Sequence, residues 1–152
     1  QLAMKYKFPI YGALIGAIFA IFGGIFFGVI PALTIFGFAN TDPGQFLVGF
    51  GFAGLYSSAF AILPGAVGGA YLARWLETSE RTPRDVTFHS LLIGGLAGLV
   101  AVLAFIVIFL RFWVDWMTAV FAILAIGLAS VCSLLAARWL AWKKPKFVQA
   151  KT

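Results

Sequence analysis

The chain has 152 residues, of which 62% are hydrophobic and 11% are charged, and its formal net charge is +6 at pH 7. This composition excludes a water-soluble globular domain, in which apolar residues make up about 45–50% of the chain. It also excludes a nucleic-acid-binding domain, because the basic residues stand at the ends of apolar segments and no soluble part of the chain is left to form a binding groove.

Four apolar segments follow one another, at residues 9–36, 46–73, 88–110 and 114–142. Each is long enough to cross the ~30 Å hydrocarbon core of a bilayer, which takes about 20 helical residues. Charged side chains lie only near or beyond the ends of these segments, which argues against pumps, metalloenzymes and proton-coupled carriers. We therefore predict an all-α integral membrane protein, with a single transmembrane domain over residues 1–152 built from four helices in two antiparallel hairpins.

The first segment is too long for a cleavable signal peptide, and no cleavage site followed by a soluble body is present, so we predict a permanent span. Small residues recur at every fourth position and share one helix face; they are Gly12, Gly16, Ala20, Gly24 and Gly28. The phenylalanines of this segment either face lipid or line a surface for isoprenoid tails or pigments. They include Phe19, Phe22, Phe26 and Phe27. A turn is predicted next, at residues 40–44.

Small residues also recur at every fourth position of the second segment. They are Gly49, Ala53, Ser57, Ala61, Gly65, Gly69 and Ala73. A proline inside a helix removes one backbone hydrogen bond, so Pro64 marks the expected place of a bend or an unwound turn, within residues 62–69. Ser57, Ser58 and Pro64 are therefore the candidate lining of a solute path.

Residues 74–87 join the second and third segments, and we predict them to be the main cytoplasmic loop because charged and helix-capping residues gather there. His89 follows this loop and is the only histidine of the chain. One imidazole nitrogen is enough to ligate haem iron or a chlorophyll magnesium, so His89 is a candidate axial ligand. The alternative is an interfacial side chain that pairs with Asp85, four residues earlier.

The third segment carries Gly94 and Gly98, and the fourth carries small residues at positions 125, 129, 133 and 137. Few residues separate these segments, so we predict a tight hairpin with Arg111 and Asp115 at its tip. A solvated ion pair between them would contribute about 0–1 kcal/mol. The tetrapeptide Ala-Arg-Trp-Leu at 73–76 recurs 64 positions later, at 137–140, which indicates either a tandem, parallel duplication of one hairpin or chance in so biased a composition.

The basic residues predict the orientation of the spans. Lys and Arg gather before the first segment, between the second and third, and after the fourth, whereas only Arg111 lies on the other side. By the positive-inside rule both termini face the cytoplasm, and we expect the inner (cytoplasmic) membrane of a bacterium. The basic rim would attract anionic lipid headgroups by about 1 kcal/mol per Lys or Arg near the surface.

The spans carry no recognisable catalytic residues, because their serines have no histidine or carboxylate nearby to act as a base. The glycines do not form a phosphate-binding loop, and the single cysteine, Cys132, excludes an intramolecular disulfide. We therefore predict that the protein is not an enzyme and has no metal site. Bound lipids are expected, and a pigment or haem only through His89.

Small residues at every fourth position let transmembrane helices approach closely. The candidate helix-packing residues are Gly12, Gly16, Gly24, Gly28, Gly65, Gly69, Gly94 and Gly98. They pack either the four spans against each other or the chain against other transmembrane subunits or further copies of itself. The function we expect first is a non-catalytic accessory subunit of a larger membrane complex. The alternatives are a small oligomeric transporter or channel for a neutral or lipid-like solute, and a pigment- or haem-binding subunit.

Overall fold

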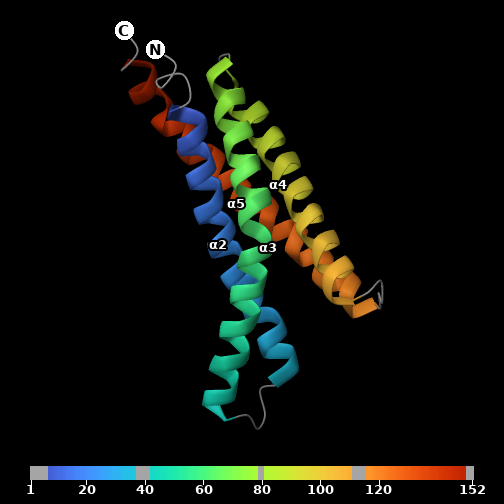
Figure 1. Cartoon of the computed structure of the whole chain (residues 1–152). Coiled ribbons are helices and arrows are strands. Elements are labelled where there is room, and N and C mark those ends of the chain that lie inside the picture. Colours follow the sequence, from blue (N-terminus) through green and yellow to red (C-terminus); the bar gives the residue numbers. More distant parts are fainter. Residues whose placement is uncertain (1–6, 37–41, 79–80, 111–115, 150–152) are drawn as a thin grey trace.

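The computed structural model describes residues 7–36, 42–78, 81–110 and 116–149, and within these ranges the regular structure is entirely helical (Figure 1). The long helices are α2 (Lys7–Phe36), α3 (Pro43–Thr78), α4 (Pro83–Phe105) and α5 (Trp116–Gln149). A short π-helical segment, η1 (Ile106–Leu110), continues α4. Each long helix contains a stretch that is long and apolar enough to cross a membrane, which confirms the predicted all-helical chain with four membrane-compatible segments.

The helices extend beyond the predicted spans. α3 continues to Thr78 and α4 begins at Pro83, so the predicted loop 74–87 is helical at both of its ends. A capping box sets the start of α4: Asp85 N donates to Thr82 Oγ1 (3.2 Å), and Thr82 N donates to Asp85 Oδ2 (3.2 Å). The charged residues therefore mark the end of the apolar segment and not the end of the helix.

Pro64 lies inside α3, yet the helix is continuous from Pro43 to Thr78. Of the two possibilities predicted for residues 62–69, a bend or an unwound turn, the unwound turn is therefore wrong. A proline removes only one hydrogen bond of the helix, and the turns beside it are held against α2 through Gly65 and Gly69. The irregular turn is instead η1, at the end of α4, which no sequence signal indicated.

α2 lies along α3, and α4 lies along α5 (Figure 1). The members of each pair run in opposite directions, because Gly12 faces Gly69 whereas Gly24, twelve residues later, faces Ser58. In the second pair, Gly94 faces Ser133 and Gly98 approaches residues 125–129. The two pairs meet near one end and diverge toward the other (Figure 1).

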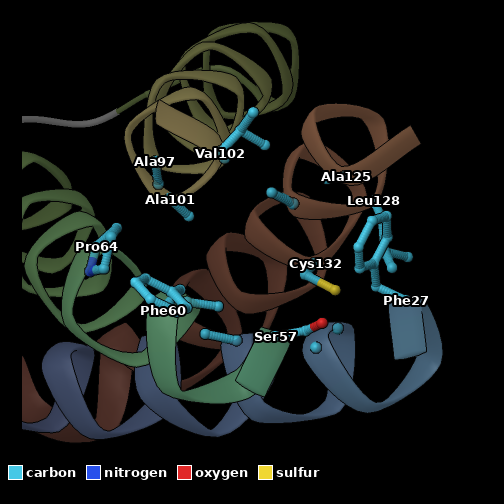
Figure 2. Close-up of a pocket in the computed structure, with 18 of the residues that line it drawn as sticks. Phe27, Ser57, Phe60, Pro64, Ala97, Ala101, Val102, Ala125, Leu128 and Cys132 are labelled. Atoms are coloured by element: carbon cyan, nitrogen blue, oxygen red, sulfur yellow. The ribbon is translucent and has the colours of Figure 1, made fainter. Parts of the chain in front are cut away.

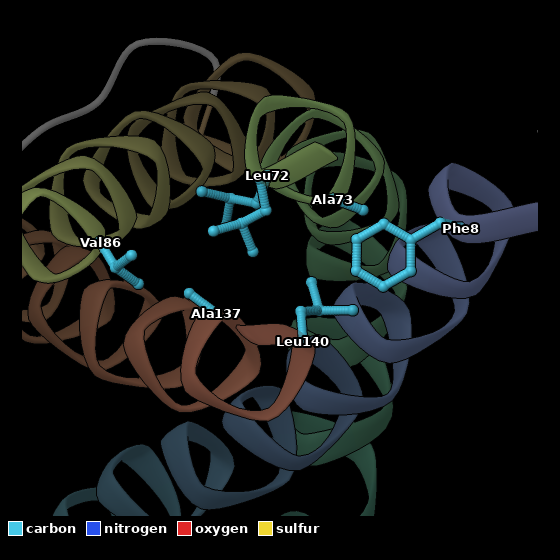
Figure 3. Close-up of a cluster of buried hydrophobic side chains, with 7 residues drawn as sticks. Phe8, Leu72, Ala73, Val86, Ala137 and Leu140 are labelled. Carbon is cyan, nitrogen blue, oxygen red and sulfur yellow. The ribbon is translucent and has the colours of Figure 1, made fainter. Parts of the chain in front are cut away.

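The buried hydrophobic core lies where the two pairs meet (Figure 3). All four helices contribute to it, through Phe8, Leu72, Ala73, Leu76, Val86, Ala137 and Leu140. Near the same end Trp139 Nε1 donates a hydrogen bond to Tyr11 Oη (3.0 Å), which links α5 to α2. We call the seven buried side chains from Phe8 to Leu140 named above the core cluster.

The cationic side chains that the structure describes lie at the same end as the core cluster, which we call the basic end. They are Lys7, Arg74, Arg81, Arg84, Arg138, Lys143 and Lys144. The opposite end, where α2 ends and α3 begins, is the far end. The predicted hairpin tip with Arg111 and Asp115 lies outside the described residues. Residues 40 and 41 of the predicted turn at 40–44 also lie outside the described residues. In the described part of that turn, Gly44 N donates a hydrogen bond to Asp42 Oδ1 (3.2 Å).

Candidate functional site

A cavity of about 730 Å³ lies between the two helix pairs and is lined by all four long helices (Figure 2). Its lining is made mainly of glycine, alanine, larger aliphatic residues and phenylalanine, and none of the described lining residues is charged. The polar side chains of the lining belong to Tyr56, Ser57, Thr118, Cys132 and Ser133. A volume of this size falls within the range of about 300–1,000 Å³ that is typical of small-molecule sites.

The cavity exists because small side chains face each other across the gap between the pairs. Ala97 and Ala101 of α4 point toward the space opposite Pro64 and Phe60 of α3, and Ala125 of α5 adds another small wall (Figure 2). The methyl groups of these alanines are too short to fill the gap between the two helix pairs. Atoms that line an empty space have no neighbours on one side and lose those dispersion contacts. An apolar molecule that enters the cavity would restore them.

Two pairs of phenylalanines bridge the gaps between the helix pairs. Phe27 of α2 meets Phe121 of α5 edge to face, with ring centroids 6.4 Å apart and an interplanar angle of 85°. Phe60 of α3 meets Phe105 of α4 in the same way, at 6.0 Å and 87°. All four rings line the cavity. Edge-to-face pairs are favourable by about 0.5–1.5 kcal/mol beyond area burial, so these rings hold the two sides of the cavity together.

The cavity is long. On α5 its lining runs from residue 118 to residue 136, which corresponds to about 27 Å at about 1.5 Å per residue. The hydrocarbon core of a bilayer is about 30 Å thick, so the cavity spans most of that depth when the helices cross it. Leu72 belongs both to the lining and to the core cluster, so the cavity reaches the core cluster at the basic end.

The candidate packing glycines lie mainly at contacts within the helix pairs. A Cβ added to Gly12 would clash with Gly69 O and Ala73 Cβ, and one added to Gly16 would clash with Gly65 O. Gly24 lies against Ser58, where an added Cβ would be 2.5 Å from the backbone nitrogen, and Gly28 is buried.

The same holds for the second pair. An added Cβ at Gly94 would lie 2.5 Å from Ser133 Cβ, and one at Gly98 would lie 2.9 Å from Ala129 Cβ. These glycine surfaces are thus occupied by helices of the same chain.

The three residues proposed for a solute path do not form one surface. Ser57 and Pro64 line the cavity. Ser58 instead points toward α2, where its side chain is buried and its Oγ donates to the carbonyl oxygen of Ile21 (3.1 Å). The difference arises because consecutive residues of a helix lie on different faces, about a quarter turn or more apart.

His89 lies at the basic end and is not among the residues that line the cavity. Its ring stacks on Trp75, with centroids 4.3 Å apart and an interplanar angle of 15°, and the Arg81 guanidinium lies 4.6 Å from the centre of the same Trp75 ring. Asp85, its expected partner, is engaged by Thr82 through the capping box. Among the described residues no group of three or more His, Cys, Asp or Glu side chains is placed to hold a metal ion.

Several cavity residues were missed by sequence reasoning. Phe19 and Phe27 line the cavity, whereas Phe22 and Phe26 are exposed, so these phenylalanines do not share one surface. The only sequence signal for the cavity position of Phe19 and Phe27 was their place around the helix relative to the face that carries the glycines. Cys132 also lines the cavity, and its sulfur lies about 3.0 Å from the position of an added Cβ at Gly23 in α2. Comparison with protein-family models, curated proteins and solved structures finds no match to this chain.

Proposed function

We propose that the protein binds a neutral, lipid-like solute in the cavity between its two helix pairs, which assigns it to the class of small transporters for such solutes. The observation that carries the proposal is the cavity itself, which is lined by four helices and has no charged side chain among the lining residues that the structure describes. An ion would have to leave its hydration shell without carbonyl or charged side-chain partners to replace it. A hydrocarbon chain, in contrast, loses nothing by leaving the surrounding lipid and gains contacts with the lining.

The glycine contacts favour this function over the one expected first from the sequence. Small-residue faces indicate partner helices only when they are free, and the faces that contain Gly12, Gly16, Gly94 and Gly98 are filled by the other helix of the same pair. They therefore support a rigid pair on each side of the cavity. The pairs themselves are separated by larger gaps, which gives the cavity its volume.

The proposed membrane topology follows from the same contacts. We infer two antiparallel hairpins, α2–α3 and α4–α5, related by a tandem duplication. Three observations support this. The small residues at positions 61, 65, 69 and 73 of α3 are followed 64 positions later by small residues of α5, and Gly94 and Gly98 lie against α5 as Gly12 and Gly16 lie against α3. The matched residues Leu76 and Leu140 both belong to the core cluster.

The orientation rests on charge. The cations of the basic end fit the positive-inside rule, so we propose that this end faces the cytoplasm of a bacterial cell and lies beside anionic headgroups of the inner membrane. The far end then faces the opposite leaflet.

Lipid analysis of the purified protein tests the proposal. We expect protein extracted in mild detergent to carry an enriched neutral lipid, identified by mass spectrometry of the organic extract. Ala101→Phe, which fills the cavity, should lose that lipid. Val100→Phe is the matched control, because Val100 is the preceding residue and 55% of it is exposed on the outer face of α4. Equal lipid content in both variants, or no enriched lipid in the wild type, would contradict the proposal.

An accessory role remains a second candidate because of one residue on the outer face of α5. An added Cβ at Gly127 would meet no atom within 4 Å, and Ile123 and Val131, one turn away on either side, are exposed. An outward-facing glycine allows a helix of another subunit to approach. If that role is correct, Gly127→Leu should release the protein from a larger complex in native gels of the source membrane, and an unchanged mobility would exclude contact through this face.

A further inference from the structure

The cavity is longer than one leaflet of a bilayer is deep. Its lining is longest on α3, from residue 56 to residue 72, and on α5, from residue 118 to residue 136. At about 1.5 Å per helical residue these ranges correspond to about 24 Å and about 27 Å. One half of the hydrocarbon core of a bilayer is about 15 Å deep. A hydrocarbon chain that fills the cavity of the membrane-embedded protein would therefore extend past the middle of the bilayer.

The volume of the cavity limits the number of chains that it can hold. An extended hydrocarbon chain advances about 1.25 Å per carbon, given single bonds of about 1.52 Å and bond angles near 111°, so about 20 carbons cover the length of the lining. A methylene group takes up about as much space as a water molecule in the liquid, about 30 Å³, so the cavity of about 730 Å³ holds about 24 such groups. Length and volume therefore agree for one extended chain, and two chains of this length would need nearly double the space.

Phenylalanine rings restrict the cavity sideways. Phe27 and Phe121 bridge the gap between α2 and α5, and Phe60 and Phe105 bridge the gap between α3 and α4. All four rings line the cavity. A chain that bends out between the helix pairs would have to separate one of these edge-to-face pairs and lose its favourable contact. The rings thus favour a chain that stays extended along the helices.

We propose that the cavity binds a single extended hydrocarbon chain of about 20 carbons, which lies along the helices between the two helix pairs. This inference rests on the proposed function and adds the number, length and conformation of the chains in the ligand. Each carbon up to this length occupies space beside the lining and gains dispersion contacts with it. Further carbons lie outside the cavity and gain none. The ligand class is therefore a lipid-like molecule with one long chain.

A series of saturated monoacylglycerols tests the length and the number of chains. The series runs from about 12 to about 24 carbons, which lie on both sides of the length set by the lining. Each is added at the same mole fraction to phosphatidylcholine nanodiscs that contain the full-length protein, and native mass spectrometry counts the molecules bound. Ala101→Phe, which fills the cavity, is measured in parallel, so that molecules bound elsewhere are subtracted.

We expect one cavity-bound molecule per protein. The ratio of bound to free amphiphile should rise by about tenfold between the shortest chain and the chain of about 20 carbons, because each added carbon gains contacts with the lining. Beyond that length the ratio should change by less than about twofold, because further carbons leave the cavity.

A shortened cavity should shift this limit. Ala122 lines the cavity four residues from the end of the lining on α5, so Ala122→Phe removes about 6 Å, or about five carbons, from its length. Ile123→Phe is the matched control, because Ile123 is the next residue, 70% of it is exposed, and it does not belong to the described lining. We expect the plateau to begin about five carbons earlier in Ala122→Phe and at the wild-type length in Ile123→Phe.

The outcomes separate this inference from the proposed function. A ratio that does not depend on chain length, a ratio that rises steadily to the longest chain, or two cavity-bound molecules per protein would overturn this inference and leave the proposed function intact. The same holds if a folded Ala122→Phe keeps the wild-type limit. If Ala122→Phe does not fold, the wild-type series decides alone. Failure of every chain length to bind above the level of Ala101→Phe would overturn both.

Discussion

A single methyl group at Gly65 tests whether the close approach of α2 and α3 holds this helix pair together. Gly65→Ala places a Cβ 2.5 Å from Ala20 Cβ and 2.9 Å from Gly16 O. Carbon atoms in contact prefer about 3.5–4.0 Å, so the helices must separate by roughly 1 Å to accept the methyl group. Overpacking of this kind costs about 1–3 kcal/mol of stability.

Gly51→Ala is the matched control, because Gly51 lies in the same helix and an added Cβ there meets no atom within 4 Å. Both variants gain the higher helix propensity of alanine, up to about 1 kcal/mol in water. The difference between them therefore isolates the clash. We expect Gly65→Ala to be less stable than Gly51→Ala by about 1–3 kcal/mol, and Gly65→Leu to lose the α2–α3 contact altogether.

Reversible unfolding in mixed micelles of dodecylmaltoside and dodecyl sulfate, followed by circular dichroism in the helical band, measures the free energy of unfolding of each variant. Equal stabilities of Gly65→Ala and Gly51→Ala would refute the reasoning. They would show that α2 and α3 move apart at no cost, so that the small residues of α3 do not fix the position of one wall of the cavity.

Three further changes test other parts of the structure. Ser58→Ala removes the hydrogen bond to the carbonyl group of α2 and should lower the free energy of unfolding in the same assay by about 0.5–1.5 kcal/mol; an unchanged value would mean that this bond is exchanged without loss. Thr82→Ala removes the capping box of α4 and should lower the free energy of unfolding by about 0.5–2 kcal/mol, whereas Thr82→Ser should keep most of the stability of the wild type. Phe60→Ala opens the gap beside Phe105 and should speed the reaction of Cys132 with N-ethylmaleimide, whereas a slower or equal rate would show that this ring pair does not restrict access.

The number and approximate position of the membrane-compatible helices could be predicted because they depend on local properties of the sequence. Apolar length set the segments, and Thr82 with Pro83 indicated the start of a helix even though the boundary was placed too far along the chain. Periodicity likewise placed Gly12, Gly16, Gly65 and Gly69 on single helix faces. The sequence left open which helix each face meets, and the structure sets them against each other within one chain.

The cavity could not be predicted, because it depends on how the two helix pairs are placed relative to each other. Alanines such as Ala97 and Ala101 carry the same local signal whether they face a neighbouring helix or an open space. The four phenylalanines that bridge the gaps lie on four different helices, so no spacing along the chain connects them. Ser57 and Ser58 show the same limit, since a difference of one position decides whether a hydroxyl faces the cavity or a neighbouring helix.

Photo-crosslinking tests the central claim most directly. A monoacylglycerol with a diazirine in its chain is incorporated into bilayers that contain the protein, and the crosslinked residues are mapped by peptide mass spectrometry. The account predicts crosslinks concentrated on cavity residues such as Phe60, Ala101 and Leu128, and their loss in Ala101→Phe. Crosslinks that are as frequent on exposed residues outside the cavity, such as Leu63, Leu96 and Ile123, and that persist in Ala101→Phe, would contradict it.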